Sequence, residues 1–251
     1  MSDQPPYGYP PQGYQGGGYP PPPARPHIRF EAIGEAWKLF QRDATTWIIS
    51  VVIYFAIVFF VGAIIGVATG VTGEVVSRTG GAAGISSIAL PAFSLVQILS
   101  RVVIFVLSTF LLGGMYRMAI KALRNEQISV TDMFGVGDVL PACLLAALLV
   151  GVVTGIGFML CILPGIIIGA LLMFTYPLIV DRRLGAIEAM TQSVNALKGE
   201  ALMAILFYLV VAIIACLGFA ACCVGVLVTF PLFILSIAVV YRDFFGAGQR
   251  Y

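Results

Sequence analysis

Charged side chains are scarce in this sequence. Asp, Glu, Lys and Arg make up only 10% of its 251 residues, whereas 60% are hydrophobic. Soluble proteins carry about 25% charged residues, so this chain has too few to cover a surface that faces water. The formal net charge of +2 is also too small for a protein that binds nucleic acid. Composition therefore predicts an integral membrane protein with no nucleic-acid partner.

Residues for metal and catalytic chemistry are scarce as well. His27 is the only histidine, and none of the five cysteines belongs to a CxxC pair. A zinc or haem site needs such ligands at set spacings, and a catalytic nucleophile needs a base beside it. The long apolar runs contain no Asp or Glu, and ion-coupled transporters usually need a buried carboxylate. We expect no enzyme activity, no metal and no cofactor.

The charged residues that are present lie in four segments, here called the charged belts: residues 25–43, 117–138, 181–200 and 242–250. They hold 12 of the 14 Lys and Arg residues, and apolar gaps of 73, 42 and 41 residues separate them. A helix crosses a membrane with about 20 residues, so each gap suits two crossings. Basic belts at both ends of every gap indicate that the chain returns each time to the cytoplasmic side. The predicted fold class is an all-α integral membrane protein with six transmembrane helices as three hairpins and both termini in the cytoplasm.

Apolar runs and breaker residues give approximate bounds for the six spans. We expect spans at about residues 46–70, 92–120, 141–160, from a Leu163–Gly165 turn to 180, 201–216 and 224–241, with an external loop over 72–91. Pro141 and Pro164 suit the first turn of a helix, where no amide partner is lost. Pro177 and Pro231 fall inside spans and should kink them.

Each hairpin is expected to follow a cytoplasmic interfacial helix. From Ile28 to Asp43, apolar residues at helical spacing share one face, and the charged residues avoid it. This pattern is typical of an amphipathic helix in the headgroup layer, with Trp37 at the interface. A repeat supports the unit, because two sets of residues share one spacing: Glu31, Ala32, Ala36 and Asp43; and Glu188, Ala189, Ser193 and Glu200. Residues Ser129–Phe134 form a shorter version, with Ser129 or Thr131 as the helix cap.

The membrane domain, residues 28–245, is flanked by two tails. Residues 1–27 hold 9 of the 14 prolines, interspersed with Gly and Tyr. Such a segment cannot bury enough apolar surface to offset its ordering entropy, so we predict disorder. It is either a docking arm for cytoplasmic proteins, with Pro20–Pro23 as a polyproline ligand, or a passive solvated tail. Residues 246–251 form a short C-terminal tail.

Glycines at four-residue spacing lie in three predicted spans. Such glycines let a second helix approach closely, either within one bundle or between copies in a homo-oligomer. The candidate packing residues are Gly62, Gly66, Gly70, Gly151, Gly155, Gly165 and Gly169.

A polar stripe marks the second span, where four residues share one helix face: Ser94, Gln97, Arg101 and Ser108. An ionisable residue inside a bilayer indicates a functional site, so Arg101 is a candidate ligand for a lipid phosphate or an anionic solute. The alternative is that Arg101 extends to the outer interface and has no further role.

Basic residues in the belts offer a second candidate site. Arg117, Lys121 and Arg124 follow the second span, and Arg182 and Arg183 follow the fourth. They are expected either to contact anionic lipid headgroups or only to determine topology.

The second half of the chain resembles a known group. The residues are Leu163-Pro-Gly165, Tyr176-Pro-Leu-Ile-Val-Asp181, Ala186-Ile-Glu-Ala189, Ser193 and Lys198-Gly199. They resemble a broad group of uncharacterised bacterial membrane proteins, which includes the six-helix membrane domain ahead of the catalytic barrel in some bacterial glycerophosphodiester phosphodiesterases. That barrel is absent here, so the resemblance implies no catalytic residue. It implies a location in the bacterial cytoplasmic (inner) membrane.

Two functions fit these observations. The first is a non-enzymatic membrane scaffold or adaptor, whose N-terminal residues 2–26 recruit protein partners. The alternative is a transporter or channel for a lipid-like or anionic substrate, which uses Arg101 and the helices containing Pro177 and Pro231.

Overall fold

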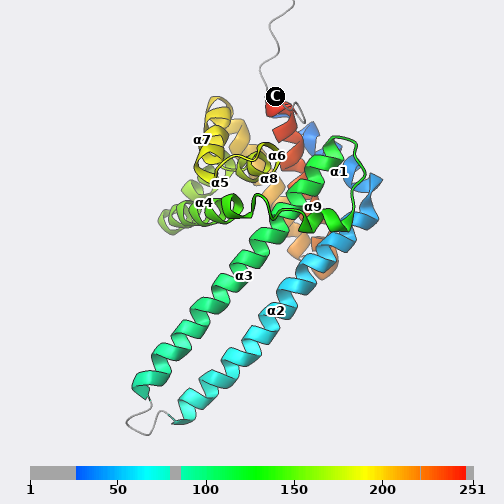
Figure 1. The fold of residues 1–251 in the computed structure, drawn as a ribbon. Helices are drawn as coiled ribbons and strands as arrows, with labels where there is room; N and C mark the ends of the chain where they lie inside the picture. The colour runs from blue at the N-terminus through cyan, green and yellow to red at the C-terminus, as the bar shows by residue number, and fades with distance from the viewer. Residues whose placement is uncertain (1–26, 80–85, 221, 247–251) are drawn as a thin grey trace, which may run out of the picture.

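The computed structural model describes residues 27–79, 86–220 and 222–246, so most of both tails lies outside the described residues. Within these ranges the chain is helical and contains no strand. The α-helices are α1 (Glu31–Arg42), α2 (Ala44–Thr79), α3 (Ser86–Leu123), α4 (Leu140–Leu160), α5 (Ile162–Leu171), α6 (Thr175–Arg182), α7 (Ala186–Leu197), α8 (Ala201–Ala220) and α9 (Cys222–Phe245) (Figure 1). Two 3₁₀ helices, η1 (Val130–Phe134) and η2 (Lys198–Glu200), precede α4 and α8.

Six helical stretches of the described chain are long and apolar enough to cross a membrane. They are Ala44–Val67, Leu95–Leu123, Leu140–Leu160, Ile162–Arg182, Ala186–Ala220 and Gly225–Phe245. The prediction of an all-helical, multi-pass membrane protein is confirmed at this level. Many large apolar side chains face outward, among them Phe59 and Phe60 of α2, as expected where lipid replaces water.

Helices α2 and α3 are longer than predicted. They contain 36 and 38 residues, which at about 1.5 Å per residue exceeds a hydrocarbon core of about 30 Å. They lie side by side and extend beyond the other helices (Figure 1). The prediction of a loop over residues 72–91 is therefore wrong in its extent. Residues 72–79 contain one glycine and no proline, and one glycine costs a helix only about 1 kcal/mol.

The fourth predicted span is broken between α5 and α6. Pro177 is the third residue of α6, so it follows the break and does not kink a continuous span. A proline at 177 cannot donate to the carbonyl of Met173, and its ring would clash with that carbonyl in a continuous helix. Pro231 does lie inside a helix, because α9 continues through it.

The turn between α4 and α5 lies earlier than predicted. Cys161 alone separates the two helices, and its backbone is extended at φ −170° and ψ 160°. Leu163 and Gly165 are already helical, so the predicted turn at these residues is wrong. Pro164 nevertheless occupies the first turn of α5, and Pro141 the first turn of α4, as predicted.

A serine from α7 hydrogen-bonds to the backbone at the break between α5 and α6. Ser193 is fully buried, and its hydroxyl donates to the Leu171 carbonyl at 2.7 Å. The same oxygen accepts the Phe174 N–H at 3.2 Å. Backbone groups inside a membrane protein need internal partners, so one side chain satisfies two groups that the break exposes.

Glycines allow close approach at the turn between α4 and α5 and against α8. A Cβ on Gly165 would lie 2.5 Å from the Phe158 ring, and one on Gly169 would lie 3.1 Å from the Tyr208 hydroxyl. Gly157, which the spacing argument did not select, approaches the backbone of Gly165, because its Cβ would lie 3.0 Å from the Gly165 Cα. These glycines therefore pack within the chain.

The other predicted packing glycines lie on α2 (Gly62, Gly66 and Gly70) and α4 (Gly151 and Gly155). A Cβ built on Gly62, Gly70, Gly151 or Gly155 meets no described atom within 4 Å. The described chain supplies no close neighbour at these four positions, so packing between copies of the chain stays a prediction.

The buried core lies around α9. This helix contacts α1, α2, α3 and α8, and its residues Ile234–Tyr241 are buried throughout. The largest fully buried side chains outside α9 are Trp47 at the start of α2, Phe174 at the α5–α6 break and Phe207 of α8. The described side chains at positions 59–67 of α2 and 95–106 of α3 stay outside this core, since each is exposed or half-buried.

We predict that Ser193→Ala lowers the melting temperature of the detergent-purified protein. The change leaves two backbone groups without a partner, and each such group destabilises the fold by about 1–3 kcal/mol. This loss corresponds to a melting temperature lower by at least several degrees. Thr191→Ala is the matched control, because the Thr191 hydroxyl bonds only to Ile187 in its own helix. Equal melting temperatures for the two variants would contradict the claim that the Ser193 hydrogen bonds stabilise the break.

Candidate functional site

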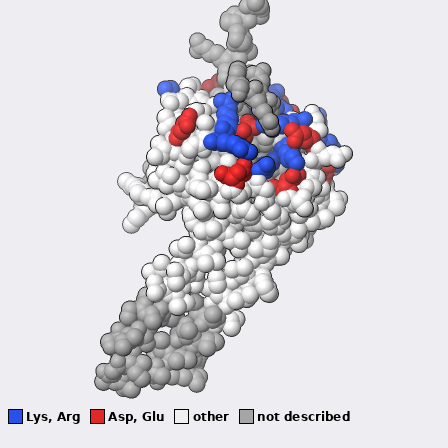
Figure 2. Space-filling view, in the orientation of Figure 1, with Lys and Arg blue, Asp and Glu red and all other residues white. Residues whose placement is uncertain are grey.

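Side chains from all four charged belts gather at one end of the molecule. Figure 2 shows basic and acidic groups side by side at this end, and no charged group on the visible part of the remaining described surface. We call it the charged end. Residues far apart in the sequence form ion pairs and hydrogen bonds there.

The first and last belts are joined by paired ions. Arg242 at the end of α9 donates to both carboxylate oxygens of Glu35 on α1, at 2.5 and 2.9 Å. Arg29 donates to Asp243 at 2.6 Å. The Arg242 hydrogen bonds hold the pKa of Glu35 below its ordinary value, and the hydrogen bond to Asp243 raises the pKa of Arg29. The start of the described chain is fixed further because the Ile28 N–H donates to Glu200 at 2.8 Å.

Asp181, at the end of α6, joins three helices. Its carboxylate accepts hydrogen bonds from Arg124, which directly follows α3, and, at 2.8 Å, from the Tyr241 hydroxyl of α9. Only 5% of the Asp181 side chain is exposed. A nearly buried carboxylate is stable only with such partners, so this junction fixes the ends of α3, α6 and α9 relative to one another.

A basic pocket lies beside this junction, between the ends of α3 and α6. It has a volume of about 550 Å³, and its charged lining residues are Arg117, Lys121, Arg124, Glu126, Asp138, Asp181, Arg182 and Arg183. The basic residues are those that the sequence indicated as a possible headgroup site. The structure thus brings residues from the second and third belts into one cavity.

Most basic side chains of the pocket are oriented by a specific neighbour. Arg117 donates to the Gly135 carbonyl and lies 3.4 Å from Asp138. Arg183 pairs with the same Asp138 carboxylate at 2.9 Å. Arg182 donates to the Phe245 carbonyl at 2.9 Å, and its guanidinium lies 5.0 Å from the centre of the Phe245 ring.

Lys121 is positioned by the 3₁₀ helix η1. It pairs with Asp132 at 2.7 Å, and Asp132 also accepts the backbone N–H of Ser129 at 2.9 Å. Ser129 is the N-cap of η1, which confirms one of the two predicted caps. Burial alone would raise the pKa of Asp132, but the hydrogen bonds from Lys121 and Ser129 hold it below its ordinary value.

Arg183 has an unusual backbone conformation. It ends α6 with φ +56° and ψ 34°, in the left-handed region. For a residue other than glycine this conformation costs about 1–2 kcal/mol, and glycine is the usual residue at such a position. The Arg183 side chain is 71% exposed, so burial does not offset this cost.

The described residues of the polar stripe predicted on the second span form no site like the basic pocket. Ser108 is half-buried and lies near Tyr54 of the neighbouring helix α2. Arg101 is exposed, Gln97 is half-buried, and neither lines either of the two cavities described in this section. Ser94 belongs to α3, but its side chain lies outside the described residues.

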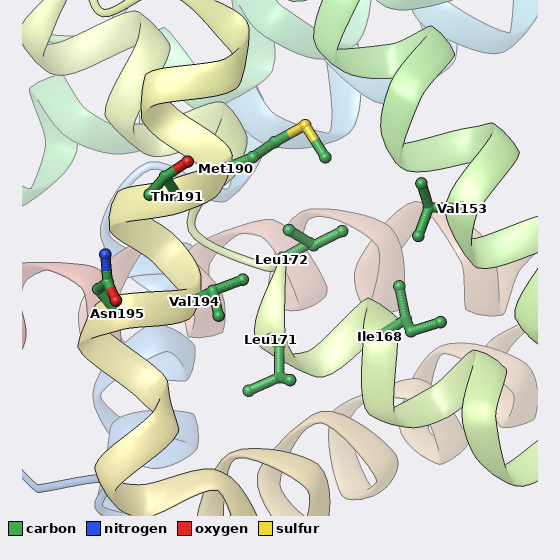
Figure 3. A pocket seen from close by; sticks show the side chains of 8 residues that line it. All are labelled: Val153, Ile168, Leu171, Leu172, Met190, Thr191, Val194 and Asn195. Atoms are coloured by element: carbon green, nitrogen blue, oxygen red, sulfur yellow. The ribbon is translucent and has the colours of Figure 1, made fainter.

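A second cavity is apolar and opens between α4, α5 and α7. Its volume is about 410 Å³, and eight residues line it: Val153, Ile168, Leu171, Leu172, Met190, Thr191, Val194 and Asn195. In Figure 3 the aliphatic side chains of α5 and α7 face one another across the gap, whereas Asn195 lies at its edge. Its lining contains no charged residue, and Thr191 and Asn195 are its polar members, so the cavity suits a mostly apolar group.

Sequence reasoning missed Asp181 and Tyr241 as a pair, and it noted Ser193 only as a repeat position. No local pattern links Asp181 to a tyrosine 60 residues later. A signal for Asp181 was nevertheless present: it is an acidic residue directly beside two arginines at the end of an apolar run.

We predict that acid destabilises the protein partly through Glu35. Its pKa is lower in the folded protein than in the unfolded chain, so the ion pair stabilises the fold above about pH 4.3 and is lost as the pH falls through the folded value. Glu35→Gln should lower the melting temperature at pH 7 by an amount equivalent to about 1 kcal/mol or less. Between pH 5 and 3, the melting temperature of this variant should fall by less than that of the wild type. Glu31→Gln on the same helix is the control; an identical acid response in both variants would contradict the prediction.

The chain is similar to uncharacterized mycobacterial proteins. It is 26% identical, over 243 residues, to the uncharacterized protein Rv2560 of Mycobacterium tuberculosis strain H37Rv, an alignment that covers 92% of this chain and 74% of that protein. The same identity and coverage hold for the uncharacterized protein Mb2590 of Mycobacterium bovis. No protein-family model and no solved structure matches the chain.

Proposed function

We propose that this chain is a non-enzymatic scaffold or adaptor of the bacterial cytoplasmic membrane. Its six candidate spans form three hairpins, and the charged end faces the cytoplasm. Each hairpin follows an interfacial segment: α1 before α2, η1 before α4, and α7 before α8. The N-terminal residues 2–26 recruit protein partners to this surface.

The gathering of the belts at one end is the observation that carries the proposal. Basic residues are retained on the cytoplasmic side of membrane proteins, and 12 of the 14 here belong to the belts. Ion pairs or hydrogen bonds connect every belt to another one, as between Arg242 and Glu35 or between Arg124 and Asp181. A single charged layer therefore agrees with a chain that returns to one side after each pair of crossings.

The two helices α1 and α7 support the repeated unit. Residues at equivalent positions of the predicted repeat are fully buried in both: Ala32 with Ala189, and Ala36 with Ser193. Trp37 on α1 is 41% exposed, which suits a residue at the membrane interface.

The attachment point of the N-terminal tail supports an adaptor role. Ile28 and Arg29 are held at the charged end by Glu200 and Asp243, so the preceding residues leave the membrane domain there. A proline- and tyrosine-rich segment at this position can reach soluble proteins without crossing the bilayer.

The transport alternative has less support. Arg101 lines neither cavity, and an anionic substrate would need a polar path to reach it. The relation to the membrane domain of glycerophosphodiester phosphodiesterases and the formation of homo-oligomers stay predictions.

Deletion of residues 2–26 tests the adaptor role. We expect the deleted form to keep the melting temperature of the full chain and to lose specific proteins from its set of crosslinked neighbours, measured by quantitative mass spectrometry in cells. A variant in which serine replaces Tyr7, Tyr9, Tyr14 and Tyr19 controls for tail length and should lose part of the same set. An unchanged set in both forms would contradict the proposal.

A further inference from the structure

We propose that the basic pocket between the ends of α3 and α6 binds a phosphate group. The group is carried either by the headgroup of an anionic phospholipid or by a small soluble phosphate ester. The inference rests on the proposed function only for the lipid source, because that source requires the charged end to lie at the headgroup layer.

Charge is the first argument. Five basic side chains and three carboxylates line the pocket, and basic residues stay in excess when Asp132, the partner of Lys121, is included. Two of the carboxylates are already neutralised, since Asp138 pairs with Arg117 and Arg183, and Asp181 pairs with Arg124. With Asp132 included, the five basic residues exceed the four carboxylates by one positive charge, so the pocket favours an anion over a cation.

A donor without a partner is the second argument. The Nε–H of Arg124 is buried, and no described atom accepts a hydrogen bond from it. Buried donors are normally satisfied, and a guanidinium presents its donors in a planar fork that fits phosphate oxygens. Arg124 lines the pocket, but water cannot reach its Nε–H. A bound oxyanion can therefore supply the missing acceptor only when the Arg124 side chain turns toward the pocket.

The conformation of Arg183 is the third argument. Glycine would fit the left-handed backbone at this position without strain, yet the chain has an arginine whose charge reaches the pocket. Residues other than glycine that are held in the left-handed region are concentrated at functional sites. The arrangement is explained if the arginine side chain contributes to ligand binding.

The pocket also has a suitable size and position. Its volume of about 550 Å³ accommodates a phosphate together with the first atoms of its ester group. Arg124 and Arg182 stand at the ends of two candidate spans, Leu95–Leu123 and Ile162–Arg182. Basic residues at such positions are the usual contacts of anionic headgroups.

Arg183→Gly tests the proposal, because it removes the charge and relieves the backbone. The purified full chain in a neutral detergent is titrated with dioleoylphosphatidylglycerol in mixed micelles, with dioleoylphosphatidylcholine as the neutral comparison. In a second arm it is titrated with inorganic phosphate and with glycerol 3-phosphate at constant ionic strength. Binding is followed by native mass spectrometry for the lipids and by the shift in melting temperature for all probes.

We expect the wild-type chain to bind an anionic probe and Arg183→Gly to bind it about tenfold more weakly, the loss typical of one charge-assisted hydrogen bond. The unliganded variant should melt at the same temperature as the wild type or higher, which separates binding from folding. Lys198→Gly is the matched control: it removes an exposed charge at the same end, outside the pocket, and should bind like the wild type.

The two arms identify the source of the phosphate. Binding of phosphatidylglycerol alone assigns the pocket to lipid headgroups, and binding of the soluble phosphates assigns it to a soluble ester. Absence of binding in both arms, or equal affinity of Arg183→Gly and Lys198→Gly, would overturn the proposal. Such a failure would leave the crosslinked neighbours of residues 2–26 unaffected, so it is distinguishable from failure of the adaptor role.

Discussion

The exclusion of charge from hydrocarbon is the constraint on which the rest of this structure depends. A chain with so few charged residues could distribute them along its spans only at several kcal/mol for each one. It instead places nearly all of them in belts that meet at one end. Asp181 illustrates the result: it lies directly after an apolar run, and its nearly buried carboxylate joins Arg124, at the end of α3, to Tyr241 of α9. The ion pairs therefore set the relative positions of spans whose apolar surfaces have little orientational preference.

A second consequence concerns the backbone inside the membrane. The break between α5 and α6 would leave amide groups without partners, and Ser193 of α7 satisfies two of them. Helix α7 thus contributes to the integrity of a span that precedes it in the chain. At the equivalent position of the proposed repeat, α1 has Ala36, which is equally buried but carries no hydroxyl that could satisfy backbone groups.

The charged end combines two features with separate roles. In the pairs Arg242–Glu35 and Arg29–Asp243, each charged group already has a partner of opposite charge, and the pairs link the first belt to the last. The pocket beside Asp181 is different, because it retains an unpartnered donor on Arg124 and an exposed arginine in a strained conformation. The first feature explains how the chain folds back to one surface. The second indicates where that surface can bind a ligand.

The number of candidate spans and the grouping of charge could be predicted from the sequence, because both follow from the spacing of the belts. The extent of α2 and α3 could not, since glycine and serine weaken a helix without ending it. The site of the break could not be located either: Pro177 indicated a disruption, but the effect of a proline falls on the turn before it.

The sequence indicated which basic residues cluster, but not which residues they contact. Arg117, Lys121 and Arg124 were recognisable as a cluster, whereas their contacts with the α6 end depend on tertiary packing. The polar stripe around Arg101 was the more conspicuous pattern, yet two of its side chains, Arg101 and Gln97, line neither cavity. Helical spacing shows which residues share a face; it does not show what that face contacts.

The most direct test of the account is the side of the membrane on which the charged end lies. Cys161, exposed at the turn between α4 and α5, should lie outside the cell, and Gly199, exposed at the charged end with free space around it, should lie inside. A chain that retains Cys161 as its only cysteine should react with an impermeant maleimide on intact cells. A cysteine-free chain carrying Gly199→Cys should react only after permeabilisation. Labelling of Gly199→Cys on intact cells, or of Cys161 only after permeabilisation, would contradict the account.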